Sequence, residues 1–249
     1  MRAFRIGQIV PSSNITMETE IPAMLRAREA TAPERFTFHS SRMRMKSVTK
    51  AELEQMNAQA DRCAVELSDA QVDVMGYACL VAIMSMGNGY HRTSEERLRG
   101  IAASEGSRAE VVSSAGALIP GLKVMGARRV AIMTPYMKPL TALVKAYIEN
   151  EGIEVTDALS LEISNNMAVG ERDPRALIDI IDRLNIEHAD VVVASACVQM
   201  PSLASIAPLE AKLGMPVVSA ATCTVHAMLK RLGLRAMVPD AGAILSGRY

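Results

Sequence analysis

The chain has 249 residues, of which 49% are hydrophobic, and its 27 lysine and arginine residues balance 27 aspartate and glutamate residues. There is enough apolar material for one or two cores, whereas the zero net charge excludes a general electrostatic attraction to nucleic acid or to an anionic membrane. No apolar run approaches the roughly 18 residues of a membrane span, and residues 1–6 run into a strand pattern without the features of a signal peptide, so we expect a cytoplasmic protein with no membrane or nucleic-acid partner.

Short, continuous apolar runs alternate with helical patterns in the first half of the chain, which is typical of buried parallel strands joined by crossover helices. The predicted strands are Phe4–Val10, Phe36–Met43, Asp73–Ala78 and Ala109–Ser113. The predicted helices are Thr16–Ala30, Lys50–Ser68, Ser94–Ala103 and Ala117–Met125. Thr49 and Glu52 have the spacing of a capping box at the start of the second helix.

The second half repeats this alternation. The predicted strands are Arg129–Thr134, Glu154–Ala158, Asp190–Ser195 and Pro216–Ala220. The predicted helices are Lys138–Glu151, Pro174–Asn185, Ser202–Leu213 and Cys223–Leu232. Pro174 is a favourable first residue of a helix, and Gly214 and Gly233 are suitable helix ends.

The two halves also resemble each other in sequence. Three pairs of segments match loosely: Arg5–Pro11 with Arg129–Pro135, Asp73–Cys79 with Asp190–Cys197, and Glu110–Ser114 with Met215–Ala220. A coincidental similarity between two α/β halves is the alternative, but the order of the matches favours an internal duplication.

In each half, a cysteine lies just after the third predicted strand. Cys79 and Cys197 therefore fall at the carboxyl ends of parallel strands, where open α/β sheets bind ligands. A thiolate is a far better nucleophile than a thiol, and a loop leading into a helix supplies the positive potential that favours it. Either cysteine alone would be better explained as a small buried residue, but their equivalent positions favour catalysis.

Three further loops at strand ends carry polar groups that suit a carboxylate. They are Pro11–Glu18, which contains Ser13 and Asn14, then Thr134–Tyr136, and Ser164–Met167, which contains Asn166. Each has a simpler alternative: helix capping for the first, packing of a tyrosine for the second, and a turn built on asparagine for the third.

The remaining cysteines and histidines give no metal signal. Cys63 and Cys223 form no C-x-x-C pair and no zinc spacing with the others, so we expect both to be core residues. The four histidines are scattered. Gly87–His91 is rich in turn residues and lacks a phosphate-binding pattern, so we interpret it as a flexible lid or connection.

These motifs resemble the aspartate/glutamate racemase superfamily and, within it, the maleate cis-trans isomerase family. The resemblance covers essentially the whole chain. The segments that carry it are Pro11–Asn14, Thr16–Pro22, Tyr77–Cys79, Thr134–Tyr136, Asn165–Asn166 and Ser195–Pro201.

The resemblance implies an α/β fold of two pseudo-symmetric three-layer domains, each with a four-stranded parallel sheet flanked by helices. The active site would lie in the cleft between them. The expected domains are residues 1–115 plus 221–249, carrying Cys79, and residues 116–220, carrying Cys197. It also implies a homodimer that uses neither a cofactor nor a metal, and an association with nicotinate degradation.

The resemblance also implies roles for individual residues. Cys79 and Cys197 would be catalytic, and a small dicarboxylate such as maleate or fumarate would be held by Asn14, Tyr136 and Asn166. The further substrate-binding positions expected beside these residues are Ser13, Ala78, Leu80 and Val198.

The reaction expected on this basis is isomerisation of maleate to fumarate. Cys79 would add to the double bond, the succinyl-cysteine intermediate would rotate, and elimination would follow, with Cys197 as the acid/base partner. Three alternatives stay open: a two-cysteine racemase of aspartate, glutamate or a hydantoin, a decarboxylase of the arylmalonate type, and a protein that binds dicarboxylates without turning them over.

Overall fold

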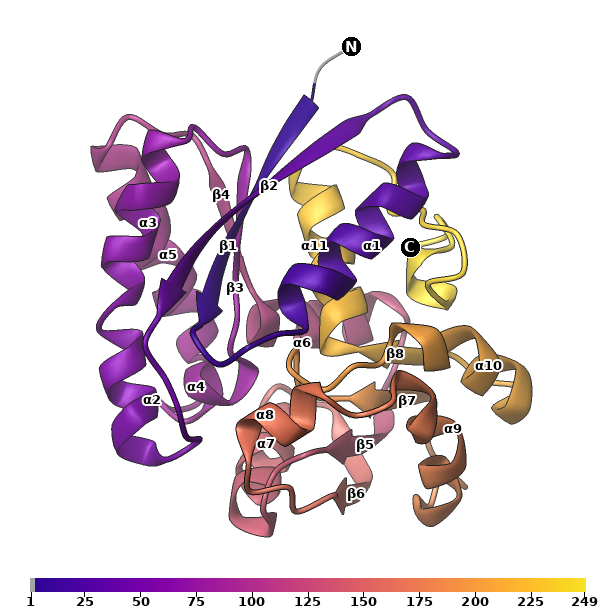
Figure 1. Ribbon diagram of the computed structural model, residues 1–249. Coiled ribbons are helices and arrows are strands. Elements are labelled where there is room, and N and C mark those ends of the chain that lie inside the picture. Colours follow the sequence, from indigo (N-terminus) through magenta and orange to yellow (C-terminus); the bar gives the residue numbers. More distant parts are fainter. Residues whose placement is uncertain (1–2) are drawn as a thin grey trace.

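The computed structural model describes residues 3–249, so the start of the N-terminal segment, where the sequence predicts no signal peptide, lies outside the described residues. The chain forms two four-stranded parallel sheets, one above the other in Figure 1. Their strand orders are β2-β1-β3-β4 and β6-β5-β7-β8. Because the second order repeats the first strand for strand, the sheets have the pseudo-symmetry that the sequence repeats predict, and the expected fold class is confirmed.

The first sheet and its helices occupy the N-terminal half. Its strands are β1 (Ala3–Pro11), β2 (Arg35–Met43), β3 (Val74–Tyr77) and β4 (Glu110–Ser113). The helices of this half are α1 (Met17–Glu29), α2 (Lys50–Asn57), α3 (Ala60–Asp69), α4 (Leu80–Met84), α5 (Tyr90–Ser104) and α6 (Ser114–Val124).

The second sheet follows in the same way. Its strands are β5 (Arg129–Thr134), β6 (Glu154–Ser160), β7 (Val191–Ser195) and β8 (Val217–Ser219). The helices of this half are α7 (Lys138–Asn150), α8 (Asn166–Gly170), α9 (Leu177–Ile180), α10 (Leu203–Leu213) and α11 (Ala220–Arg231), with short 3₁₀ turns at Pro174–Ala176, Ile181–Arg183 and Ala243–Leu245.

Helices cover both faces of the first sheet, so its central strands are apolar on both sides. A Cβ at Gly7 of β1 would meet Leu67 of α3, and a Cβ at Gly76 of β3 would meet Met228 of α11 and Met17 of α1. Helix α11 follows the last strand of the second sheet, yet it packs against β3, β4, α1 and α6 of the first (Figure 1).

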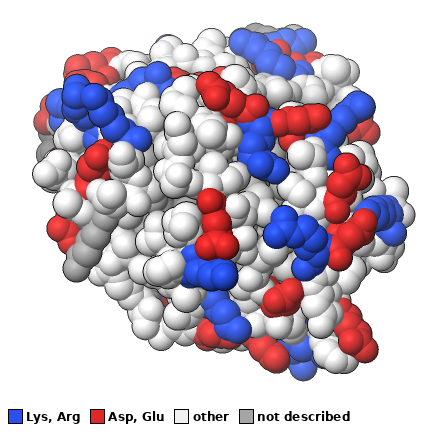
Figure 2. All heavy atoms as spheres, turned by 60° about the horizontal axis from the view of Figure 1, so that its bottom comes forward, with Lys and Arg blue, Asp and Glu red and all other residues white. Residues whose placement is uncertain are grey.

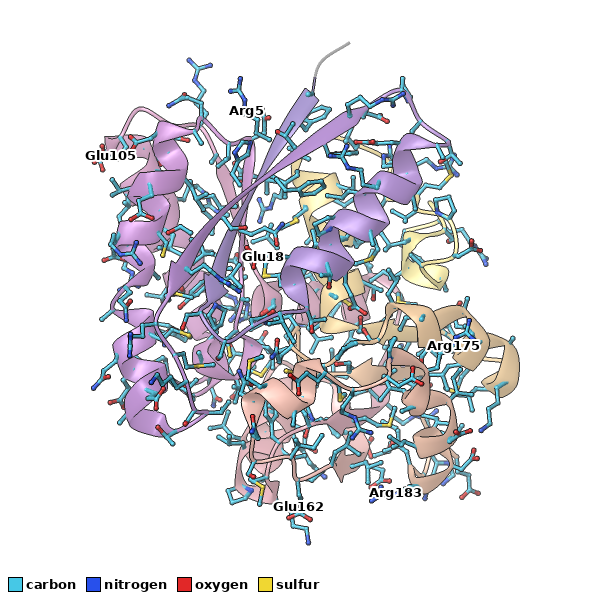
Figure 3. All side chains as sticks on the ribbon, viewed as in Figure 1. Arg5, Glu18, Glu105, Glu162, Arg175 and Arg183 are labelled. Carbon is cyan, nitrogen blue, oxygen red and sulfur yellow. The ribbon has the colours of Figure 1, made fainter. Side chains whose placement is uncertain are left out.

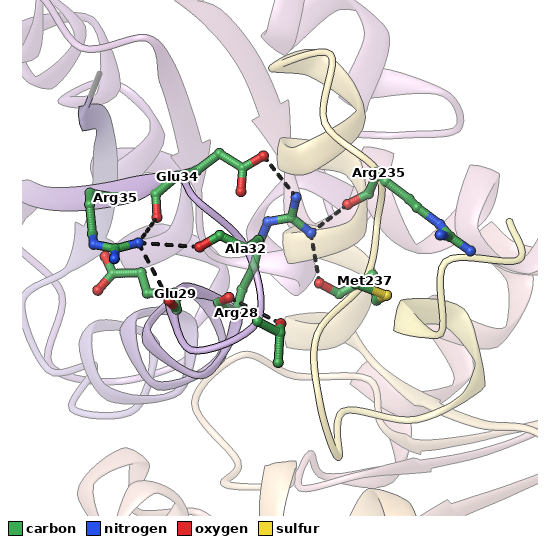
Figure 4. A network of polar contacts seen from close by, with 8 residues as sticks. Arg28, Glu29, Ala32, Glu34, Arg35, Arg235 and Met237 are labelled. Atoms are coloured by element: carbon green, nitrogen blue, oxygen red, sulfur yellow. Dashed lines mark hydrogen bonds and ion pairs between the residues drawn. The ribbon is translucent and has the colours of Figure 1, made fainter. Parts of the chain in front are cut away.

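The C-terminal tail is also fastened to the first half. Arg28 of α1 is almost fully buried, and its Nη1 donates to the carbonyl oxygens of Arg235 at 2.7 Å and Met237 at 2.8 Å (Figure 4). Its Nη2 forms an ion pair with Glu34 at 3.2 Å. The domain boundaries at residues 115, 116, 220 and 221 stay a prediction.

Several helix predictions were wrong in detail. The helix predicted over Lys50–Ser68 is broken into α2 and α3, and the one predicted over Pro174–Asn185 is a run of 3₁₀ turns around the four-residue α9. Thr49 accepts from the Glu52 N–H as expected, but the Glu52 carboxylate accepts from Lys46 and Ser47, so the reciprocal half of the capping box is missing.

The segment Gly87–His91 is a loop only in part, because its last two residues begin a helix. Gly89 adopts φ +72°, a left-handed conformation that glycine reaches without steric cost, and caps α5, which begins at Tyr90. None of the helices in residues 3–249 is long and apolar enough to cross a membrane.

Candidate active site

A small cavity lies where the carboxyl ends of the two sheets face each other. Its walls come from both halves of the chain. The lining residues are Pro11, Asn14, Met45, Val48, Cys79, Leu80, Val81, Tyr136, Asn166, Cys197, Val198 and Gln199. Cys79 and Cys197 therefore share one cavity, as the sequence predicts.

Cys79 lies at the junction between β3 and α4. It is the N-cap residue of α4, its peptide bond with Ala78 is cis, and 8% of its surface is exposed. Burial raises the pKa of its thiol to about 12, and the proximity of Cys197 contributes to this increase, whereas the backbone N–H groups of Ala82 and Val81 act to lower the pKa.

Cys197 has the equivalent place after β7 and is 6% exposed. The N–H of Gln199 donates to its Sγ at 3.4 Å. Burial raises the pKa of this thiol, while the Tyr136 hydroxyl and the N–H groups of Gln199 and Met200 act to lower it. Each thiol thus has nearby donors that would stabilise a thiolate, but two thiolates in one cavity would repel each other.

Tyr136 stands beside both sulfur atoms. Its hydroxyl is buried, and burial and the two neighbouring cysteines raise its pKa well above the usual range, so the phenol stays protonated. Although the Cys197 sulfur is close enough to affect it, the hydroxyl has no hydrogen-bond partner of good geometry among residues 3–249. A buried donor without a partner in the wall of a cavity is available to a ligand.

Asn14 caps a helix and still has a free amide group. Its Oδ1 accepts from the N–H groups of Thr16 and Met17, both at 2.9 Å, at the start of α1. No partner of its Nδ2 is found among residues 3–249, and the side chain lines the cavity. Both sequence interpretations are therefore compatible, because the oxygen serves the helix and the NH₂ is left for a ligand.

Asn166 lines the cavity on the side of the second half. It opens α8, where Asn165 is the N-cap, and its Nδ2 donates to Ser13 Oγ at 2.8 Å. This bond joins the two loops that carry Asn14 and Asn166.

The wall of the cavity contains no lysine, arginine, aspartate or glutamate. Charged side chains are spread over the outside instead: Figure 2 shows both signs mixed over one face, and Glu105, Glu162 and Arg183 lie at the outer edges in Figure 3. An anionic ligand would therefore be held by neutral N–H, amide and hydroxyl donors. Within residues 3–249, no group of three histidine, cysteine, aspartate or glutamate side chains could hold a metal ion.

Known proteins share both the sequence and the fold. A family model described as arylmalonate decarboxylase matches residues 6–245. A maleate isomerase of Pseudomonas putida is 63% identical over 246 residues, covering 99% of this chain and 98% of the relative. The chain belongs to the maleate isomerase family. It is an isomerase, and the resemblance to the aspartate/glutamate racemase superfamily is confirmed.

Two solved structures of maleate isomerases superpose on nearly the whole chain. One is a cysteine-to-alanine variant of a Pseudomonas putida maleate isomerase with maleate, 60% identical, with a TM-score of 0.98 over 100% of this chain and 99% of the other. The other is a cysteine-to-serine variant of the Nocardia farcinica maleate cis-trans isomerase with a covalently bound succinylcysteine intermediate, 43% identical, with a TM-score of 0.95 over 100% of both chains.

In this maleate isomerase fold, most of the predicted site residues meet at one place. Leu80 and Val198, each following a cysteine, line the cavity together with the residues described above. Ser13 and Ala78 do not line it. Ser13 accepts a hydrogen bond from Asn166, which does line the cavity, and Ala78, the residue before Cys79, is fully buried.

Five lining residues were not among the predicted site residues: Pro11, Met45, Val48, Val81 and Gln199. Met45 and Val48 come from the connection between β2 and α2, and their only signal is an apolar side chain in a polar loop. Gln199 lies in the segment Ser195–Pro201, which carries the family resemblance, but nothing in the sequence distinguished it as a site residue.

Proposed function

We propose that this isomerase converts maleate to fumarate, with Cys79 as the nucleophile and Cys197 as the acid/base partner. The observation that carries the proposal is the placement of two buried thiols and an unpartnered tyrosine hydroxyl in the wall of one uncharged cavity. The succinylcysteine found in the Nocardia farcinica relative supports covalent addition.

Rotation about a double bond requires that the bond be removed temporarily. The Cys79 thiolate attacks one olefinic carbon, and the π electrons move to the neighbouring carbon and into its carboxylate. Cys197 gives its proton to that carbon. The product is a succinyl thioether on Cys79, in which the former double bond is single and can turn by half a revolution.

Elimination reverses these steps after rotation. The Cys197 thiolate takes a proton back, the double bond forms again, and the bond between carbon and the Cys79 sulfur breaks. Fumarate leaves, and Cys79 and Cys197 return to their starting protonation states. No cofactor is consumed in this cycle.

The protonation states that this cycle needs follow from the shared cavity. Because the neighbouring Cys197 raises the pKa of the Cys79 thiol, the pair holds at most one negative charge when it reacts. One thiolate and one thiol are the nucleophile and the proton donor of the addition step.

Neutral donors then stabilise the charge that develops on the substrate carboxylate. We assign this work to Asn14 Nδ2, the Tyr136 hydroxyl and Asn166, together with the backbone N–H groups beside the cysteines. Donors already aimed at the developing charge cost no reorganisation during the reaction. The roles of Ser13, Ala78, Leu80 and Val198 remain proposals for positioning and shape.

The mass of the protein after brief exposure to maleate tests the assignment. In Cys197→Ala, which keeps the nucleophile and lacks the proton partner, we expect a mass increase of one maleic acid located on Cys79. In Cys79→Ala, we expect no adduct and a loss of turnover of roughly 1,000-fold or more. Cys63→Ala is the matched control, because Cys63 is buried in α3 and does not line the cavity.

Three outcomes would contradict the proposal. Near wild-type isomerisation by Cys79→Ala would exclude Cys79 as the nucleophile. Exchange of the Cα hydrogen of aspartate or glutamate with deuterium, without conversion of maleate, would identify a two-cysteine racemase instead. Binding of maleate without either reaction would identify a dicarboxylate-binding protein.

A further inference from the structure

We propose that Gln199 is a positioning residue that fastens the loops carrying Asn14 and Asn166 to the loop carrying Cys197. The proposal rests on the function above, since it assigns Gln199 a part in organising that same site. Gln199 follows Cys197 by two residues, is 3% exposed and lines the cavity.

The side-chain amide of Gln199 joins both halves of the chain. Its Oε1 accepts from the N–H of Ile15 at 2.9 Å, and its Nε2 donates to the carbonyl of Ser13 at 3.0 Å. The second hydrogen of Nε2 goes to the carbonyl of Asn166 at 2.9 Å. The residues on either side of Asn14 are thus fixed by one amide group.

The main chain of Gln199 completes the arrangement. Its N–H donates to the Cys197 sulfur at 3.4 Å, and its carbonyl accepts from Thr16 Oγ1 at 2.7 Å. Three segments that are far apart in the sequence therefore meet at Gln199, and each of them carries a residue of the proposed site.

The hydrogen bonds of the Gln199 side chain indicate a positioning role rather than direct contact with the substrate. Both hydrogens of the Gln199 amide are already used, so it has no donor left for a substrate carboxylate. Its effect on the reaction must pass through the residues that it holds.

Gly170, the last residue of α8, makes room for this amide. A Cβ at Gly170 would lie 2.7 Å from Gln199 Nε2 and 2.6 Å from Ile15 Cγ1. Gly170→Ala therefore displaces the same contacts without changing Gln199, and provides an independent second variant.

The test compares two variants with two matched controls. Gln199→Glu keeps the shape and the acceptor for Ile15 but replaces the donor to two carbonyls with oxygen. Its control is Gln55→Glu, because Gln55 is exposed on α2. The control for Gly170→Ala is Gly100→Ala, because a Cβ at Gly100 of α5 meets nothing within 4 Å. The measurements are kcat and KM for maleate against pH, and the rate of iodoacetamide alkylation of Cys197.

We expect Gln199→Glu to lower kcat/KM by roughly 10- to 100-fold relative to Gln55→Glu at about pH 8, because misplaced groups cost reaction rate steeply. The loss should shrink toward about pH 6, since a protonated glutamate can donate one of the two lost hydrogen bonds. Gly170→Ala should lose kcat/KM in the same direction relative to Gly100→Ala, and Cys197 should be alkylated faster in both site variants.

Activity of Gln199→Glu equal to that of its control over this pH range would overturn the proposal. A loss of the same size at every pH would do so as well, because it would indicate general destabilisation. If Gln199→Glu does not fold, Gly170→Ala decides by its kcat/KM and its Cys197 alkylation rate relative to Gly100→Ala, without the pH criterion, and values equal to those of Gly100→Ala would overturn the proposal. The alkylation rates do not depend on isomerase activity, so they test Gln199 even if the wild-type protein converts no maleate.

Discussion

At the scale of single residues, Tyr136 offers a clean separation of activity from stability. Its buried hydroxyl makes no hydrogen bond of good geometry in the described chain and acts mainly on the Cys197 thiol, so its removal should affect the reacting group more than the fold. We expect Tyr136→Phe to lower kcat/KM by roughly 100-fold or more, the usual effect of losing one preorganised donor. The melting temperature should stay the same or rise. A variant that loses stability and activity together would show that the hydroxyl holds the fold instead.

The raised pKa values of the two thiols predict a pH dependence. A thiol with a pKa near 12 is almost entirely protonated at neutral pH, and its thiolate fraction grows about tenfold per pH unit below that value. Alkylation of Cys79 by iodoacetamide in the unliganded protein should therefore rise steadily between about pH 7 and about pH 10. A plateau near neutral pH would mean that the thiolate is already formed.

The cysteines could be found from the sequence because they sit at equivalent points of two repeats, and parallel strands bring their carboxyl ends to one edge. The role of Gln199 could not be found in that way. Its partners Ser13, Ile15 and Asn166 are separated from it by 186, 184 and 33 residues, and only the packing of the two halves brings them within hydrogen-bond distance.

At the scale of elements, the break between α2 and α3 has a structural reason that the apolar pattern conceals. Asn57 ends α2 with its side chain buried, and its Nδ2 donates to the carbonyl of Ala82 in α4 at 3.1 Å. Its Oδ1 accepts from the hydroxyl of Tyr77, the last residue of β3. Asn57 therefore supports both elements that flank Cys79.

Replacing Asn57 should weaken this support. Asn57→Ala leaves a buried tyrosine hydroxyl and a buried carbonyl without partners, so we expect it to reduce the free energy of unfolding by about 2–4 kcal/mol. Urea denaturation measures this loss. Asn57→Asp keeps the acceptor for Tyr77 and serves as the partial variant. An unchanged stability in Asn57→Ala would mean that the break has another cause.

Short helices explain the other differences between sequence and structure. Helices α4 and α8 have five residues each, which is too short for a periodic apolar pattern, although both begin at residues that line the cavity. The longer α5, α7 and α10 have enough turns to show such a pattern, and their predicted positions agree with the structure to within a few residues.

At the scale of the whole molecule, the cavity depends on how the two halves are held together. Near α1, the carboxylate of Glu20 accepts a hydrogen bond from the start of α10. Near α5, Arg92 forms an ion pair with Glu151 of the second half at 2.5 Å, and the ring of His91 contacts the Tyr147 hydroxyl at 2.6 Å. The candidate active site thus lies between two sets of contacts that join the halves. The homodimer and the cytoplasmic location stay predictions.

The contact made by Glu20 depends on pH, because it involves an ionisable carboxyl group. Its carboxylate accepts from the N–H groups of Ser202 and Leu203, both at 2.6 Å, at the start of α10, and it is 8% exposed. Burial raises its pKa, although these hydrogen bonds act to lower it. Because the folded state binds this proton more tightly than the unfolded chain, the associated stability is complete below the unfolded pKa and is lost as the pH rises through the folded pKa.

Glu20→Gln should remove this loss of stability at high pH. The amide oxygen can keep both hydrogen bonds to the start of α10 but cannot ionise. We expect the free energy of unfolding of the wild type to fall, relative to this variant, as the pH rises from about 4 to about 8. Each pKa unit of increase corresponds to about 1.4 kcal/mol. The control is Glu187→Gln, which removes the same charge from an exposed position. Urea denaturation across this pH range measures the difference, and a constant difference between wild type and Glu20→Gln would show that Glu20 has the same pKa in the folded and the unfolded chain.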